Sequence, residues 1–298
     1  MTEKIKKIDI HAHATAFPEF RCLQGEQQWL STEEQLAVYQ QLNIEKGVLL
    51  PVVSPEGQWL PLSNESCWLL TRKYPDSFLW FCNVDPRAGQ NHPKTDLSRL
   101  LAHYKALGAR GVGEITAHLY ADDPQVDNLF YHCAEMKLPV ILHLAPQLGC
   151  GFGLVDEMGL PRLEKMLKKH PDLILIGHSQ PFWAELSSDL TEPERDGYPK
   201  GKISEGTLPR LMREYGNLYC DLSAWSGANA LMRDPEYAAS FLAEFSDRIL
   251  YGCDICSVQQ TQGMELDRFL DNMVSAGQLS ISIYERIVRT NAMKLLNL

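Results

Sequence analysis

Residues 8–13 read IDIHAH, a short apolar run that ends in two histidines one residue apart. In a β-strand the side chains of residues i and i+2 project to the same face, so His11 and His13 can both reach one metal ion. A helix would place the two imidazoles on diverging faces. The stretch therefore predicts a strand that delivers metal ligands to the mouth of a barrel.

Seven further apolar runs rich in β-branched residues alternate with longer helical patterns, which is typical of repeated βα units and a parallel sheet. The total of eight is the number that a closed (β/α)8 barrel, or TIM barrel, requires. The expected strands are Ile8–His13, Lys46–Val52, Phe78–Val84, Ala109–Ile115, Val140–Leu144, Leu173–His178, Asn217–Leu222 and Arg248–Cys253.

Helical patterns fill the intervals between these strands, and several begin with a capping Ser, Thr or Asp. No Gly/Ser linker or low-complexity tract interrupts residues 1–298, so we expect a single domain with an extra C-terminal helix over Ser282–Leu296. The other expected helices are Thr32–Leu42, Asn64–Tyr74, Asp96–Ala106, Gln125–Met136, Leu160–Lys169, Leu208–Tyr215, Asp234–Phe245 and Gly263–Ala276.

The composition, with 45% hydrophobic and 22% charged residues and a net charge of -10, is that of an ordinary acidic globular chain. The negative charge opposes non-specific binding to nucleic acid or anionic membranes, which requires clustered Lys and Arg. No run approaches the ~20 apolar residues of a membrane span, and the N-terminus does not resemble a signal peptide. We expect a cytoplasmic protein that acts on a small molecule, with a homodimer as the default assembly.

Six residues suited to metal binding fall at the carboxyl ends of the expected strands, where a barrel builds its active site. Imidazoles and carboxylates suit zinc first, with manganese or iron as alternatives, and a catalytic site keeps a position for water. Singly each has a structural alternative, such as a salt bridge, a turn or a helix cap, but the joint pattern favours a metal centre. The six are His11, His13, Glu114, His143, His178 and Asp254.

Several stretches resemble the strand-end motifs of the amidohydrolase superfamily, particularly its amidohydrolase 2 branch, also called aminocarboxymuconate-semialdehyde decarboxylase-like. The resemblance covers nearly the whole chain and implies a distorted (β/α)8 barrel. The motifs are IDIHAHA (8–14), KYPDSFLWFCNVDPR (73–87), LPVILHLA (138–145), LILIGHSQ (173–180), RILYGCD (248–254) and IVRTNAMKLL (287–296).

This resemblance implies roles for the strand-end residues. It makes His178 a catalytic acid/base and, in hydrolytic members, makes Asp254 the group that moves a proton from water to the leaving group. His178 then orients the substrate or binds a second metal. The ligands that it implies for a single metal are His11, His13, His143 and Asp254.

Glu114, in GARGVGEI (108–115), stands where two-metal members carry a bridging carboxylate or carbamylated lysine at the end of the fourth strand. A bridging role would give a site with two ions. The alternative is a carboxylate that holds a ligand histidine or a water molecule, with one ion in the site.

Two residues are candidates for substrate binding. Arg87 can pair with a substrate carboxylate, although a structural ion pair with an acidic neighbour is the favoured alternative. Trp183 is one of four tryptophans, with Trp29, Trp59 and Trp225, in connections after strands, where aromatic rings line pockets or pin loops.

Two cysteines depart from the family pattern, and one connection between expected strands is unusually long. Cys253 and Cys256 stand where the family often has Ser and Pro, and their C-x-x-C spacing raises a redox role that the strand-like context disfavours. Residues 179–207 are long enough for a lid or an oligomer contact.

The leading functional hypothesis is a metal-dependent hydrolase that activates water to cleave an amide, a lactone or a related C–N or C–O bond. The runner-up is a lyase of the same branch, a non-oxidative decarboxylase or hydratase for a small carboxylic acid, aromatic or aliphatic. That lyase would need one metal and a cation for the carboxylate. A third hypothesis is a non-catalytic metal-binding protein.

Overall fold

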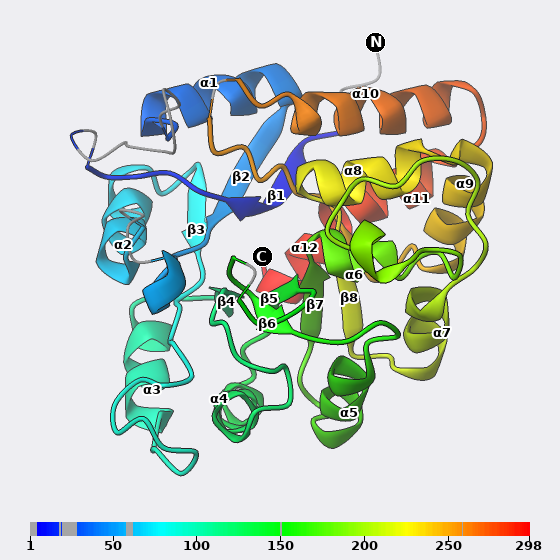
Figure 1. Ribbon diagram of the computed structural model, residues 1–298. Coiled ribbons are helices and arrows are strands. Elements are labelled where there is room, and N and C mark those ends of the chain that lie inside the picture. Colours follow the sequence, from blue (N-terminus) through cyan, green and yellow to red (C-terminus); the bar gives the residue numbers. More distant parts are fainter. Residues whose placement is uncertain (1–4, 18, 20–28, 58–61, 150, 258) are drawn as a thin grey trace.

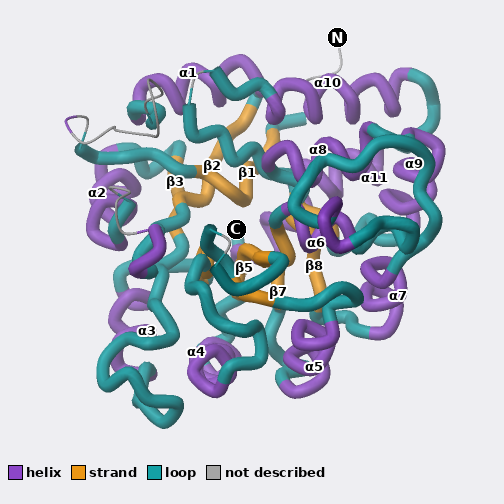
Figure 2. Tube along the Cα trace, in the orientation of Figure 1, coloured by secondary structure: helices purple, strands orange, loops and turns teal. Residues whose placement is uncertain are grey.

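The computed structural model describes residues 5–17, 19, 29–57, 62–149, 151–257 and 259–298. The strands gather at the centre and the helices surround them (Figures 1 and 2). All strand pairs are parallel, in two sheets ordered β1-β2-β3 and β4-β5-β7-β8-β9, with β6 paired to β5. The strands are β1 Lys7–Ala12, β2 Ile44–Leu49, β3 Phe78–Trp80, β4 Val112–Ile115, β5 Val140–Ala145, β6 Leu154–Val155, β7 Leu175–His178, β8 Leu218–Asp221 and β9 Ile249–Leu250.

Backbone hydrogen bonds join the two sheets at both seams. Between β3 and β4, Cys82 N donates to Gly111 O over 3.0 Å and Gly113 N donates to Cys82 O over 2.8 Å. Between β9 and β1, Ile10 N donates to Tyr251 O and Asp254 N donates to His11 O, each over 3.0 Å. The predicted (β/α)8 barrel is confirmed, and β6 is an addition to its eight strands.

The barrel is distorted where the predicted ligands lie. The pairing register shifts between Asp9 and Ala12 in β1 and between Val112 and Ile115 in β4. Ile10 packs with core residues of the neighbouring strands inside the barrel. The next residue, His11, also turns its side chain inward, toward Asp254. An irregularity of the β-bulge kind re-aims side chains in this way.

The expected helices agree with the structure to within a few residues, and some of them begin at a side-chain cap. Ser31 and Glu34 form a capping box at the start of α1, and Ser63 caps α2. The helices are α1 Thr32–Leu42, α2 Asn64–Lys73, α3 Ser98–Ala106, α4 Pro124–Glu135, α5 Pro161–Lys169, α6 Gln180–Ala184, α7 Thr207–Glu214, α8 Ala224–Met232, α9 Pro235–Glu244, α10 Gln262–Ser275, α11 Ile281–Glu285 and α12 Asn291–Leu296, with short helical turns at Pro55–Gly57 and Glu192–Glu194.

Three helical regions differ from expectation, the first being the short helix α6, which lies in the connection after β7 and was not predicted. Helix α8 was not predicted, because its sequence AWSGANALM contains Gly, Ser and Asn, which have low helix propensity. The expected C-terminal helix is interrupted by a π-helical turn at Arg286–Thr290, between α11 and α12.

The barrel interior is filled by apolar side chains from successive strands, with α12 closing one end. Ala292 and Leu296 of α12 belong to the same buried cluster as the strand residues. Arg110, which precedes β4, donates to Leu296 O over 3.3 Å, so α12 covers the amino-terminal end of the strands. The strand residues of the cluster are Ile8, Ile10, Val48, Leu50, Phe81, Ile141, Ile176 and Leu250.

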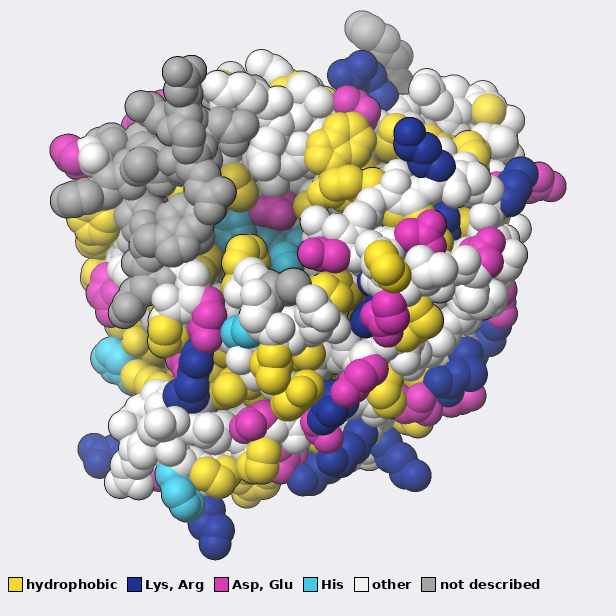
Figure 3. Space-filling view, in the orientation of Figure 1, with side chains coloured by type: hydrophobic (Ala, Val, Ile, Leu, Met, Phe, Trp, Pro, Cys, Tyr) yellow, Lys and Arg dark blue, Asp and Glu magenta, His cyan; other side chains and the backbone are white. Residues whose placement is uncertain are grey.

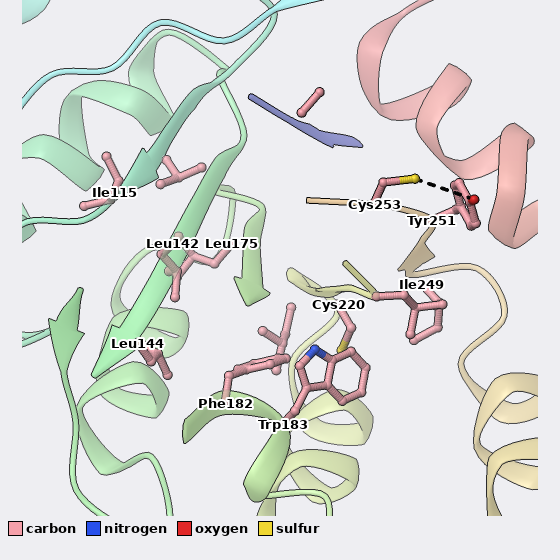
Figure 4. Packing of buried hydrophobic residues seen from close by; sticks show 14 of the residues in the cluster. Ile115, Leu142, Leu144, Leu175, Phe182, Trp183, Cys220, Ile249, Tyr251 and Cys253 are labelled. Atoms are coloured by element: carbon pink, nitrogen blue, oxygen red, sulfur yellow. Dashed lines mark hydrogen bonds between the residues drawn. The ribbon is translucent and has the colours of Figure 1, made fainter. Parts of the chain in front are cut away.

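Trp183 lies in the hydrophobic core, so its predicted contact with substrate is not supported. It is 3% exposed, and its Nε1 donates to Asp221 O over 3.0 Å. Figure 4 shows its ring beside the side chains of Phe182 and Cys220. The reason is local: α6 begins directly after β7 and carries the indole back between the strands and the outer helices.

The connection after β7 is anchored to the barrel in the part that the structure describes. Arg195, 1% exposed, donates to Asp156 O and Glu157 O and pairs with Glu185. The role of residues 179–207 as a lid or an oligomer contact stays a prediction. Within the described residues, no helix has the length and apolar character needed to cross a bilayer.

Replacing Trp183 with Ala should lower the free energy of unfolding by about 3–5 kcal/mol, because it leaves a large cavity and removes a buried hydrogen bond. The measurement is urea unfolding of the metal-free protein. Trp225→Ala, a matched change at a partly buried ring, should cost less. Equal losses in the two variants would contradict the core position of Trp183.

Candidate metal centre

Two imidazoles from β1 and its extension turn the same ring nitrogen toward each other. The Nε2 atoms of His11 and His13 lie 3.1 Å apart, while each Nδ1 contacts an acceptor on the opposite side of its ring. Nδ1 of His13 lies 3.0 Å from Leu50 O, and a carbonyl can only accept, so this nitrogen carries the proton. Nδ1 of His11 donates to Asp221 Oδ2 over 2.7 Å. In the neutral rings both Nε2 atoms therefore present lone pairs.

Two carboxylates complete the set of donors around these lone pairs. Oε2 of Glu114 lies 3.6 Å from both Nε2 atoms. Oδ1 of Asp254 lies 3.7 Å from Nε2 of His11 and 3.5 Å from Nε2 of His13. We call His11, His13, Glu114 and Asp254 the cage.

The cage has the dimensions of a metal site. Ligand atoms around a tetrahedral ion with bonds of about 2.1 Å lie about 3.4 Å from one another. Lone pairs and carboxylates that converge at such distances repel each other unless a cation lies between them. The residues thus fit a divalent ion.

His178 adds a second, overlapping group that can hold an ion. Its Nε2 lies 3.7 Å from Asp254 Oδ2, and its ring centroid lies 4.5 Å from that of His11. His11, Glu114 and His178 form one candidate group, and His11, His13 and Asp254 form another. Because both groups use His11, whose free Nε2 lone pair can bind only one ion, the two groups overlap and cannot both be completely filled.

His143, a ligand according to the family resemblance, contacts one of the cage carboxylates. Its Nδ1 lies 2.7 Å from Glu114 Oε1, so the imidazole orients the carboxylate. Among the described residues it belongs to neither candidate metal group. The ring of Phe152 lies against it, tilted by 52° with 4.7 Å between the ring centroids, and the backbone of Gly153 passes close by. Its role as a ligand stays a prediction.

Asp221, at the end of β8, was missed in the sequence. Besides the hydrogen bond from His11, its Oδ2 accepts from Ser223 Oγ over 2.7 Å and lies 3.2 Å from Nδ1 of His178. Ser223 Oγ lies 3.0 Å from the same Nδ1. The available signal was its place, since Asp221 ends a buried apolar run in the same way as the other site residues do.

In the metal-free cage, the imidazole of His11 and the carboxylate of Glu114 each stabilise the charged form of the other. Burial lowers the pKa of His11, but the carboxylates of Asp254, Glu114 and Asp221 outweigh it and raise the pKa well above its usual value. Burial raises the pKa of Glu114, but the neighbouring histidines hold it well below its usual value. A proton on His11 thus occupies the place where a cation fits.

Asp9 supports β1 from behind the cage. Burial raises its pKa to about 7, although the backbone N–H groups of His11 and Cys253 and the Tyr39 hydroxyl all donate to it. These hydrogen bonds tie β1 to α1 and to the segment that carries Asp254.

A cavity of about 110 Å³ opens onto the cage. Figure 3 shows histidine and acidic side chains at the bottom of a hollow on this face. Trp29, one of the tryptophans considered as pocket residues, lines the cavity. Trp59, another of them, lies outside the described residues. The described lining is His13, Trp29, Val52, Gly57, Glu114, Thr116, His143, Phe152, Asp254 and Cys256.

Arg87 makes a structural ion pair instead of lining the described cavity. Its guanidinium donates two hydrogen bonds to Asp85 and two to Glu56, at 2.8–2.9 Å. These contacts use all three guanidinium nitrogens, so the predicted contact with substrate is not supported.

The two cysteines are poor candidates for redox chemistry. Burial raises the pKa of both thiols well above the usual value, which disfavours the reactive thiolate. Cys253 donates to Tyr251 OH over 3.6 Å, and Cys256 Sγ lies 3.4 Å from Asp254 Oδ1. Cys256 therefore packs against a cage carboxylate.

A family model described as amidohydrolase matches residues 8–298, nearly the whole chain. The chain belongs to the amidohydrolase family. The resemblance seen in the strand-end motifs is thus confirmed. A search of curated proteins found no significant match.

Solved structures share the fold of this amidohydrolase at low sequence identity. Three examples are a manganese complex of 5-carboxyvanillate decarboxylase from Novosphingobium aromaticivorans (19% identity, 99% of this chain and 97% of that chain covered, TM-score 0.64), 2,6-dihydroxybenzoate decarboxylase from Rhizobium (15%, 98% and 98%, 0.62), and a probable 2-pyrone-4,6-dicarboxylic acid hydrolase from Acinetobacter baumannii with citric acid bound (13%, 98% and 100%, 0.61).

Replacing Asp221 with Asn should weaken metal binding about 10–100-fold, because the acceptor that orients His11 loses its charge. Competition with a chromophoric chelator measures the affinity. Asp247→Asn, which changes an exposed carboxylate, is the matched control and should leave the affinity unchanged. An unchanged affinity in Asp221→Asn would show that the cage does not depend on this contact.

Metal affinity should rise with pH, by about ten-fold per unit for each proton that the ion displaces. The raised pKa of His11 extends this competition to higher pH, so binding at pH 8 should be at least ten-fold tighter than at pH 6. The same chelator competition at the two values, with the chelator calibrated at each, measures the slope. Equal affinities would contradict the protonated state of His11 in the metal-free protein.

Proposed function

We propose that this amidohydrolase is a metal-dependent hydrolase that cleaves an amide, lactone or related C–N or C–O bond of a small molecule. The observation that carries the proposal is the position of Asp254. One of its oxygens faces the cage, and the other lies 3.7 Å from Nε2 of His178. A group held in this way can exchange a proton with water on one side and with an imidazole on the other.

His11, His13, Glu114 and Asp254 would hold the ion, with His178 available for a second. Zinc is the first candidate for this set of imidazole and carboxylate donors, and manganese is an alternative. The bound ion would supply a Lewis acid that polarises a carbonyl and lowers the pKa of water.

The protein itself supplies the proton path. Asp254 accepts a proton from the attacking water, and His178 lies within reach to orient the carbonyl oxygen or to exchange the proton. The water oxygen bonds to the carbonyl carbon, the C–O or C–N bond breaks, and the leaving oxygen or nitrogen receives the proton.

The lining of the cavity favours hydrolysis over decarboxylation. Among its described residues there is no Lys or Arg, and Arg87 is committed to Asp85 and Glu56. A lyase for carboxylic acids would need a cation to hold the substrate carboxylate.

The alternative is a non-oxidative decarboxylase or hydratase of a small carboxylic acid. The observation that favours it is the fold shared with 5-carboxyvanillate and 2,6-dihydroxybenzoate decarboxylases. Release of CO2 from aromatic carboxylic acids, without turnover of lactones or amides, would establish this alternative.

Asp254→Asn should reduce the turnover of lactones and amides about 10²–10⁴-fold, because the amide cannot accept a proton. A panel of lactones and amides, assayed with zinc- and manganese-loaded protein, provides the measurement. Metal content by plasma mass spectrometry shows whether the variant still binds its ion, and Asp271→Asn, on the outer helix α10, is the control. Full activity in a metal-containing Asp254→Asn would overturn the mechanism.

A further inference from the structure

The hydroxyl of Thr116 is a buried polar group that the described residues leave without a hydrogen-bond partner. Thr116 is 1% exposed, and its Oγ1 has no hydrogen-bond partner among the residues that the structure describes. It lines the same cavity as the cage residues. A buried hydroxyl without a hydrogen bond destabilises the fold. Its presence beside a cavity therefore indicates a ligand that forms the missing hydrogen bond.

Thr116 stands two residues beyond Glu114, just past the end of β4. In an extended chain such residues project to the same side, about 7 Å apart. The hydroxyl is therefore placed to bind a part of the ligand that lies above the cage, toward the mouth of the barrel. Gly57 lies beside it: a Cβ at that position would clash with Val52 Cγ1 and would lie 4.0 Å from Thr116 Oγ1.

The walls around this hydroxyl are apolar and close. Trp29, Val52 and Phe152 line the cavity, and its volume is about 110 Å³. A cavity of about 150 Å³ is sufficient to bind benzene. The enclosed part of a ligand is thus no larger than a single ring.

The charge of the site opposes an anionic ligand. Glu114 and Asp221 are buried and Asp254 is partly buried; together these carboxylates carry three negative charges, so a site with one divalent ion keeps a net charge of -1. The described lining contains no Lys or Arg. Among these described lining residues, a substrate carboxylate that lies away from the ion would find no counter-charge and would be repelled.

We propose that the site selects a small uncharged cyclic ester or amide. Its ring lies between the apolar walls, and a polar substituent or ring atom forms a hydrogen bond with Thr116 Oγ1. This inference rests on the proposed hydrolase function and names its substrate class. Thr116 is then a specificity-determining residue.

Two probes test the proposal: 2-pyrone, a neutral ring lactone, and 2-pyrone-4,6-dicarboxylate, the same ring with two carboxylates. Binding to zinc-loaded protein is measured by tryptophan fluorescence, and ring opening by loss of pyrone absorbance. We expect 2-pyrone to bind at least ten-fold more tightly than the dicarboxylate. Preference for the dicarboxylate, or binding of neither probe, would overturn the proposal.

Thr116→Val, which removes the hydroxyl at nearly constant volume, should weaken 2-pyrone binding about three- to ten-fold. Thr116→Ser, which retains a hydroxyl, should regain most of that loss. Thr71→Val, the same change on helix α2 away from the cavity, is the control. An unchanged affinity in Thr116→Val would remove the assigned role of Thr116.

The design separates failure of the inference from failure of the proposed function. Binding of 2-pyrone that depends on Thr116 but leads to no ring opening would overturn the hydrolase and retain the binding site. Opening of the dicarboxylate in preference to 2-pyrone would retain the hydrolase and overturn the selection for uncharged rings.

Discussion

The hydrogen bond from Nδ1 of His11 to Asp221 is the interaction on which the metal centre depends. By holding the proton on the outer nitrogen, it leaves Nε2 as a lone pair that faces His13, Glu114 and Asp254. Both candidate metal groups include His11. A fully buried carboxylate is itself costly, and here hydrogen bonds from His11 and Ser223 compensate for its burial.

The barrel converts distant sequence positions into one site. His11 and Asp254 are far apart in the chain, yet the hydrogen bond from Asp254 N to His11 O joins their backbones directly. Asn83 performs a similar function on the other side, because its side chain donates to Pro51 O and to Glu114 O. The two seams of the barrel are thus also the places where the cage residues are fixed relative to one another.

The repeat of apolar strands and capped helices made the barrel predictable from the sequence, and the strand ends located five of the six predicted metal residues in the two candidate groups. A contact of Glu114 with a ligand histidine was one of two alternatives in the sequence, but its identity as His143 was not predictable, because it depends on side-chain rotamers and on the close approach of Gly153. Asp221 was missed since a single carboxylate in an apolar run has no partner visible in the sequence. Trp183 shows the converse limit: a loop position does not reveal which way a ring turns.

The plug that α12 forms at the amino-terminal end of the barrel has a consequence for traffic through the site. With Ala292 and Leu296 packed against the interior, the described residues close the amino-terminal end of the barrel, so small molecules enter and leave the site from the opposite side. Arrival and departure then share one passage, so a slow-leaving product would block the next arrival. Phe152 is exposed and lines the cavity, so its ring is placed to affect the rates of substrate entry and product release.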